Sequence, residues 1–232
     1  MDQDQGVHQR VAKIEALGEL TAQPRWVVWR LEPNPKKPKP DKMPYTPGTI
    51  RMAKANDPAT WRSFAEAVAA LDSGSWAGIG FELGGSGITG IDLDHCIDPA
   101  TGEMHPAALK IVSTLDTYAE ISQSGTGIHL LAKGKLPPGG RKTGKAIPWG
   151  GELELYDTGR FFALTGDHLP DTPLAVEDRQ QEVAELHAQF FSPKPAPAGP
   201  QPPARTLTRD DDKIVELARK ARNSSTFAAL YD

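Results

Sequence analysis

The sequence predicts an α+β protein, in which antiparallel strand pairs pack against helices on one side. Short apolar runs bounded by glycine, proline and serine recur along the chain and are typical of strands. Segments with apolar residues at helical spacing separate some of these runs, without the strict alternation of a parallel α/β sheet. A chain of 232 residues, 38% of them hydrophobic, is long enough to bury a core beneath such elements.

The amino-terminal part predicts a helix, a strand and a second helix. The first helix is indicated by apolar residues at helical spacing: Val11, Ile14, Leu17 and Leu20. Aromatic and β-branched residues predict a strand over 25–31, RWVVWRL. After a proline-rich loop, Asp57-Pro58 predicts the start of a helix that continues to residue 73, because a capping residue before a first-turn proline is a common helix start.

Three pairs of strands are predicted between residues 77 and 166, each joined by a short glycine-containing turn. They lie at 77–83 and 87–94, at 118–123 and 127–133, and at 152–157 and 160–166. The first pair, joined by Gly-Gly-Ser, and the last pair, turning at Thr158-Gly159, are predicted to be hairpins. Helices are expected near 105–115 and 176–191.

The composition divides the chain into three parts. Residues 1–191 form one predicted domain. Residues 192–207 begin with SPKPAPAGPQPPA and predict an extended proline-rich linker. Residues 208–232 have acids near their start, at 210–212, and continue at helical spacing, which predicts the beginning of a helical accessory domain. Because its apolar residues lack partners, we expect the chain to be a piece of a longer protein.

Composition excludes several classes of protein. The one cysteine, Cys96, allows neither an intrachain disulfide nor a cysteine-rich zinc module. No apolar run approaches the roughly 18 residues of a membrane span. The amino terminus, MDQDQGVHQR, lacks the pattern of a secretion signal, so we expect a cytoplasmic protein without a membrane partner.

Although the net charge is −4, the chain contains two basic segments. The first runs from Pro33 to Asn56 and includes Lys42 and Arg51. The second runs from Ile121 to Gly151, has no acid, and includes three residues that we call the loop cations: Arg141, Lys142 and Lys145. Such segments can attract phosphates through their local field, although they are equally typical of solvated loops.

Paired aspartates in GITGIDLDHCID (87–98) are the first candidate functional feature. Because strand side chains alternate between faces, Asp92 and Asp94 share one face, roughly 6–7 Å apart, while Ile91 and Leu93 share the other. Two such carboxylates repel each other unless a divalent cation lies between them. The alternative is a half-exposed strand with its acidic face in water.

Two further segments carry candidate functional residues. SGTGIH (124–129) places Ser124 and His129 across a glycine-rich turn whose amides could surround an anion, although an ordinary hairpin turn is an equal alternative. ELELYD (152–157) puts Glu152 and Glu154 on one strand face, as would any amphipathic strand.

The order of these three segments resembles the primase-polymerases of the archaeo-eukaryotic primase superfamily, and most closely the single-chain enzymes of phages and mobile elements. GIDLD is similar to the family's first acidic motif, SGTGIH to its serine-x-histidine motif, and ELELYDTGRFFALTG (152–166) to its third motif. The likeness covers about residues 24–170, including PRWVVWRL and the DKMPYTP loop (41–47).

This resemblance implies the archaeo-eukaryotic primase catalytic fold, with an RNA-recognition-like unit and flanking helices. It also implies DNA primase and polymerase activity in phage, plasmid or mobile-element replication, by two-metal nucleotidyl transfer. Asp92, Asp94 and Glu154 would bind two Mg²⁺ or Mn²⁺ ions, Glu154 being preferred over Glu152 or Asp157, with His129 as a fourth catalytic residue. The triphosphate would be held by Ser124, Gly125, Gly127 and His129, with Lys42, Arg51 and Arg160 as neutralising partners.

The implied partners are a single-stranded DNA template, a primer, nucleoside triphosphates and a downstream helicase region, with the loop cations contacting nucleic acid. Two rival functions remain: a metal-dependent nuclease built on the same carboxylates, and a non-catalytic module that binds single strands. A dinucleotide site is disfavoured, because no glycine fingerprint precedes a helix.

Overall fold

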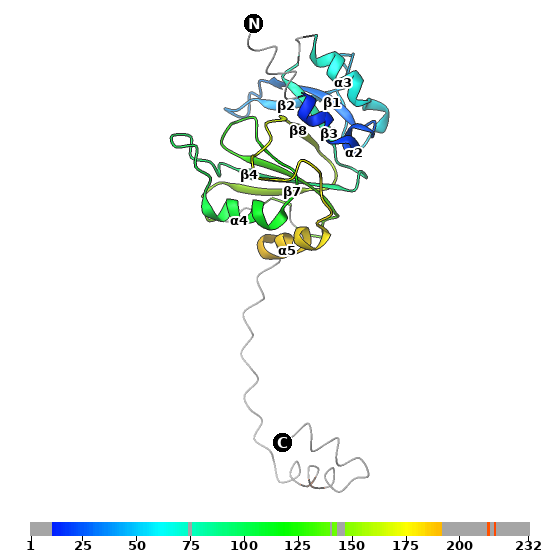
Figure 1. Ribbon diagram of the computed structural model, residues 1–232. Helices are drawn as coiled ribbons and strands as arrows, with labels where there is room; N and C mark the ends of the chain where they lie inside the picture. Colours follow the sequence, from blue (N-terminus) through cyan, green and yellow to red (C-terminus); the bar gives the residue numbers. More distant parts are fainter. Residues whose placement is uncertain are drawn as a thin grey trace. The chain divides into compact units, whose positions relative to one another are not determined.

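The computed structural model describes residues 11–73, 76–139, 141–142 and 147–191, together with Lys213 and Glu216. The chain divides into two units, Met1–Ser192 and Pro193–Asp232. The fold described here is that of the first unit (Figure 1). The predicted linker, almost all of the predicted helical segment, and Lys145 lie outside the described residues.

Two four-stranded antiparallel sheets form the described fold, which is α+β as predicted. The first sheet has the order β2-β1-β3-β8 and consists of β1 (Trp26–Glu32), β2 (Asp41–Tyr45), β3 (Gly78–Glu82) and β8 (Phe161–Leu164). The second sheet has the order β5-β6-β4-β7 and consists of β4 (Ile88–Asp94), β5 (Ala119–Ile121), β6 (Ile128–Lys133) and β7 (Glu152–Tyr156).

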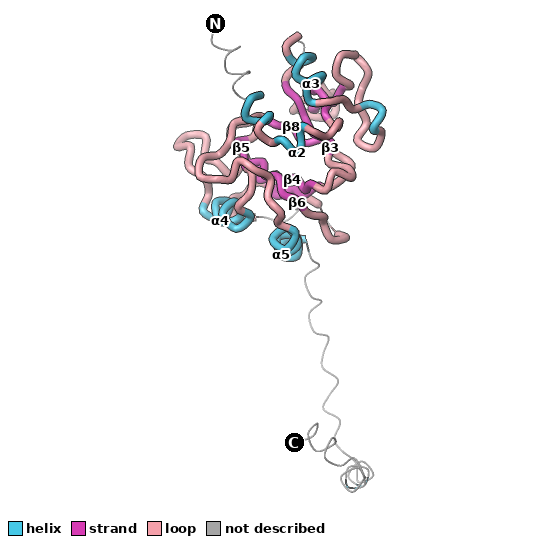
Figure 2. Tube along the Cα trace, turned by 45° about the vertical axis from the view of Figure 1, so that its right-hand side comes forward, coloured by secondary structure: helices cyan, strands magenta, loops and turns pink. Residues whose placement is uncertain are grey.

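Helices α4 (Pro106–Leu115) and α5 (Gln180–Phe191) lie together on one side of the second sheet (Figures 1 and 2). Ile91, Leu93 and Leu155 from this sheet share one buried cluster with Ile111 of α4 and Val183 of α5. The alternate side chains of β4, including both aspartates, therefore project away from these helices.

A second buried cluster connects the two sheets. Trp26 contacts Phe64 and Phe81 edge-on, with ring centroids 4.8 and 5.4 Å apart. The same cluster includes Tyr118, which directly precedes β5, and Leu131 of β6 in the second sheet. Two short elements add residues to it, α2 (Gly18–Thr21) and α3 (Phe64–Leu71). The sheets thus share a core, which fixes the residues of one relative to the other.

Both predicted hairpins are wrong, because their strands belong to different sheets. β3 pairs with β1 and β8, and β4 pairs with β6 and β7, so neither has a free edge for the other. β7 and β8 are likewise separated. The chain leaves β3 through a turn in which Gly85 and Gly87 have φ of 74° and 82°, a conformation that favours glycine.

The single helix predicted over 57–73 is also wrong. Asp57 caps only a 3₁₀ turn, η1 (Pro58–Thr60), and Trp61 is extended with φ −98° and ψ 165°. Arg62 then exchanges backbone hydrogen bonds with Trp26, at 2.9 and 3.0 Å. A capping box between Ser63 and Glu66 starts α3.

The loop predicted over 41–47 is wrong as well, because Asp41–Tyr45 forms β2 and pairs with β1. The first predicted helix is interrupted at residues 16–17, before α2. The remaining predicted elements within the described residues agree with the structure to within a few residues. The last helix, α5, starts at Gln180 rather than near residue 176. In the described ranges we find no helix with the length and hydropathy that a membrane span requires.

Candidate active site

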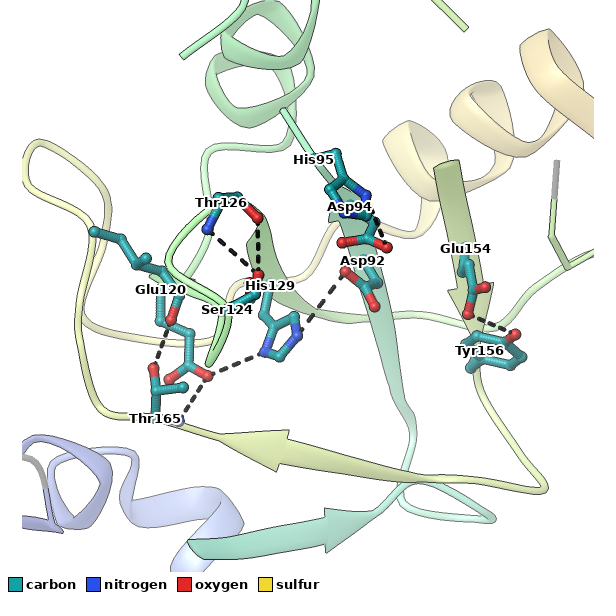
Figure 3. Close-up of polar contacts among 12 residues, drawn as sticks. Asp92, Asp94, His95, Glu120, Ser124, Thr126, His129, Glu154, Tyr156 and Thr165 are labelled. Atoms are coloured by element: carbon teal, nitrogen blue, oxygen red, sulfur yellow. Dashed lines mark hydrogen bonds and ion pairs between the residues drawn. The ribbon is translucent and has the colours of Figure 1, made fainter. Parts of the chain in front are cut away.

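Four titratable residues lie in one row across the second sheet. Asp92 on β4 is paired with Glu154 on β7 and with His129 on β6, and His129 is paired with Glu120 on β5. Because directly opposed residues of neighbouring strands project to the same face, these four side chains share the face that points away from α4 and α5. Figure 3 shows His129 between Glu120 and Asp92.

The two aspartates lie at the open end of this face. Their side chains are 28% exposed for Asp92 and 33% for Asp94. Burial raises the pKa of Asp92, the nearby His129 lowers it, and the charges of Asp94 and Glu154 raise it further. His95 places Nδ1 3.2 Å from Asp94 Oδ2. A concentration of negative charge therefore remains where solvent can reach it.

His129 is buried and held from three sides. Its Nδ1 lies 3.4 Å from Glu120 Oε1, and its Nε2 lies 3.9 Å from Asp92 Oδ1. Its ring packs against Phe162 at 4.7 Å between centroids. This contact brings the first sheet against the row, and the ring orientation leaves Nε2 on the side of the aspartates.

The serine-glycine turn lies against the end of β4. Ser122 N donates to Gly127 O at 2.8 Å, and Gly125 N donates to Ser122 O at 2.9 Å. A Cβ on Gly127 would come within 2.9 Å of the Leu93 carbonyl oxygen, so only glycine allows this approach. Ser124 Oγ is 3.0 Å from the hydroxyls of both Ser122 and Thr126. Polar groups thus line the turn next to the aspartate strand.

Glu154 is largely buried and already has three partners. Lys142 Nζ lies 2.6 Å from Oε1, while Tyr156 Oη and Arg160 Nη1 lie 2.8 and 3.1 Å from Oε2. Burial alone would raise the pKa of Glu154, but hydrogen bonds from Lys142 and Tyr156 outweigh it, so the pKa is lowered. This carboxylate is held in its charged form.

The other two acids of the third segment have different places. Glu152 is paired with Asp94 across the sheet and bound by Lys142 Nζ at 2.6 Å. Asp157 accepts from Arg141 and, at 3.0 Å, from the amide of Leu136. Of the three, only Glu154 lies in the row with Asp92, and two of the loop cations, Arg141 and Lys142, are ion-paired to this segment.

A cleft of about 390 Å³ adjoins the row, with walls from both sheets. Its lining includes Lys42 from β2, Arg160, and the rings of Tyr156 and Phe162. Desolvation lowers the pKa of Lys42, against the attraction of the two aspartates. Arg51 does not belong to this lining. Its carbonyl closes the turn after β2 by accepting from Thr46 N at 2.9 Å.

Within the parts of the chain that the structure describes, no three His, Cys, Asp or Glu side chains converge closely enough to hold a metal ion. The donor set nevertheless fits one kind of ion. Mg²⁺ is usually held by one or two carboxylates and completed by waters and substrate phosphates. Asp92 and Asp94 supply that pair of carboxylates, whereas Glu154 is occupied by cationic partners.

The sequence alone did not identify Glu120. It lies in YAEISQ, where a single acid in a strand carries no signal of function. The only indication was its position two residues before Ser122, because strand alternation places the side chains of Glu120 and Ser122 on the same face. The pairing of β5 with β6 is what brings it to His129.

A sheet face with paired aspartates, a buried histidine and a glycine-rich turn is typical of a phosphate site that works with a divalent cation. No family model matches the chain. The chain is 30% identical, over 211 residues and 90% of its length, to a protein named DNA primase-polymerase from Nitratiruptor phage NrS-1. It spans 28% of the length of that relative. This likeness supports a primase-polymerase domain of the phage type in the chain.

Proposed function

We propose that residues 1–191 are the catalytic domain of a DNA primase-polymerase, a nucleotidyltransferase that acts on a single-stranded DNA template, a primer and nucleoside triphosphates. The observation that carries this proposal is the row in which Asp92 is flanked by His129 and Glu154 on neighbouring strands. The named activity of the phage relative supports it.

The proposal extends to the fold family and the biological setting. The two antiparallel sheets are compatible with the archaeo-eukaryotic primase catalytic fold. The chain spans 28% of the length of its phage relative. We further propose a helicase region downstream as a partner of the catalytic domain. Residues 192–207 would be the linker to them, and residues 208–232 the start of a helical domain. Replication of a phage, plasmid or other mobile element is the proposed role.

Asp92 and Asp94 would hold the Mg²⁺ or Mn²⁺ of this reaction. Two such ions, when bound, neutralise the α-phosphate and activate the primer 3′-hydroxyl. Glu154 would join the aspartates as a ligand only after Lys142 or Arg160 moves away from it, because both now contact its carboxylate. Those two cations would then be available to the phosphates.

The remaining groups of the site would bind and orient the triphosphate. His129 Nε2, when it carries a proton, donates to a phosphate oxygen, and the Ser124 hydroxyl offers a further donor. Gly125, whose amide donates to Ser122 O, and Gly127, whose lack of a side chain allows the close approach to β4, would shape the turn around the phosphates. Lys42 and Arg160, which line the cleft, offset the negative charge of the phosphates. The chain thus positions and neutralises its substrate.

The test is incubation of the chain with single-stranded template, labelled nucleotides and Mn²⁺ or Mg²⁺, with and without a primer. We expect labelled product that depends on template, triphosphate and metal. Shortening of the template without triphosphate would instead identify a nuclease. Binding of single strands without any metal-dependent reaction would identify a non-catalytic module, and either result would overturn the proposal.

A further inference from the structure

Glu120 is a completely buried carboxylate at the inner end of the row. Both of its oxygens face donors. Oε1 accepts from the Thr165 amide at 2.9 Å, and Oε2 accepts from the Gly166 amide at 2.9 Å and the Tyr118 hydroxyl at 2.8 Å. Backbone amides can only donate, so together with the Tyr118 hydroxyl they favour the charged carboxylate, which only accepts.

The remaining contact of this carboxylate is with His129. Glu120 Oε1 lies 3.4 Å from Nδ1, on the side of the ring opposite Nε2 (Figure 3). Because the oxygen is an acceptor, Nδ1 must be the donor in this contact. Nε2 is then the one ring nitrogen left to face Asp92 and the cleft.

We infer that Glu120 is a positioning residue that orients His129, so that Nε2 rather than Nδ1 meets the phosphates of the triphosphate. The inference rests on the proposed function for its ligand. Burying a carboxylate is costly unless it is fully paired, and the donors at both oxygens of Glu120 meet that condition while leaving Oε1 in contact with His129. Thr165 and Gly166 follow β8 of the first sheet, so they link the ring orientation to the packing of the two sheets.

The direct test is ¹⁵N NMR of the histidine ring nitrogens in the unmodified chain. The signal of His129 is identified by its loss in His129→Ala. We expect a protonated Nδ1 in the wild type and a change of that signal in Glu120→Gln, whose amide can present a donor to the ring. A wild-type His129 with an unprotonated Nδ1 would overturn the inference, and this readout needs no variant of Glu120 that folds.

The second test is a double-mutant cycle on triphosphate affinity. Loss of a hydrogen bond to a charged group predicts that Glu120→Gln weakens triphosphate binding about tenfold. If Glu120 acts through His129, the same substitution should cause no further loss in the His129→Ala background. Equal losses in both backgrounds would mean a general structural role and would overturn the inference.

Tyr118→Phe is the matched control. It removes one hydrogen bond from Glu120 Oε2 and leaves the Oε1 contact with His129 in place. Its triphosphate affinity and its His129 signal should equal those of the wild type. If the wild type binds no triphosphate, the proposed function fails, and the NMR signals alone then decide whether Glu120 orients His129.

Discussion

Glu82 is the buried acid with the clearest consequence for stability. It lies on β3 and is fully buried, and neither carboxylate oxygen has a hydrogen-bond partner in the described part of the chain. Burial raises its pKa from 4.5 to about 7, with a small opposing effect of Arg25. The folded chain therefore keeps this proton at pH values where the unfolded chain releases it.

The sign and size of the effect follow from linkage. Well below pH 4.5 Glu82 is protonated in both states, so its titration does not change the stability. As the pH rises from 4.5 to about 7, the unfolded state gains the free energy of releasing the proton, so the free energy of unfolding falls. At about 1.4 kcal/mol for each pH unit, the stability lost is about 3 kcal/mol, and it stays lost above pH 7.

Glu82→Gln removes this titration and keeps the shape of the side chain. Urea unfolding at pH 5 and pH 8 measures the result. The free energy of unfolding of Glu82→Gln minus that of the wild type should be larger at pH 8 than at pH 5 by about 2.5 kcal/mol. The control is Glu185→Gln on the exposed face of α5, which should show no such difference. An equal difference between wild type and Glu82→Gln at both pH values would refute the reasoning.

Three further predictions concern the third acidic residue, the loop cations and the linker. Glu154→Gln should abolish nucleotide incorporation. Asp157→Asn should keep this activity, and the loss of its ion pair should lower the free energy of unfolding by at most about 1 kcal/mol. An inactive Asp157→Asn would make Asp157 the third ligand. Alanine at all three loop cations should weaken DNA binding and lower its salt slope by about one unit for each lost phosphate contact, so an unchanged slope would show that they make none. A chain ending at Phe191 should extend primed templates as well as all 232 residues do, yet make no primers; equal priming by both would show that the catalytic domain suffices.

The face of the site could be predicted from the sequence because strand alternation is local. Asp92 and Asp94 had to share a face whatever the strand paired with, and so did Glu152 and Glu154. The pairing itself is not local. Two short strands joined by glycines, such as 77–83 and 87–94, are compatible both with a hairpin and with strands of two different sheets. In the structure they belong to different sheets.

The same limit explains which candidate residues the sequence could not indicate. Glu120 becomes notable only when β5 pairs with β6 and brings it to His129. The ion pairs of Lys142 with Glu152 and Glu154 could not be read from a glycine-rich loop sequence either. Local chemistry predicted the aspartates, the histidine and the turn as candidates, and tertiary pairing shows what surrounds them.

The central claim is that the aspartate pair carries the chemistry, and substitution of each aspartate tests it most directly. Nucleotide incorporation on a primed template should fall at least about 100-fold in Asp92→Asn and in Asp94→Asn, because each removes a carboxylate needed to hold the cation. Binding to single-stranded DNA should stay near the wild-type value. Asp98→Asn, which alters an exposed aspartate in the loop after β4, is the matched control and should keep its activity. Incorporation at the wild-type rate by both folded variants, Asp92→Asn and Asp94→Asn, would contradict the account.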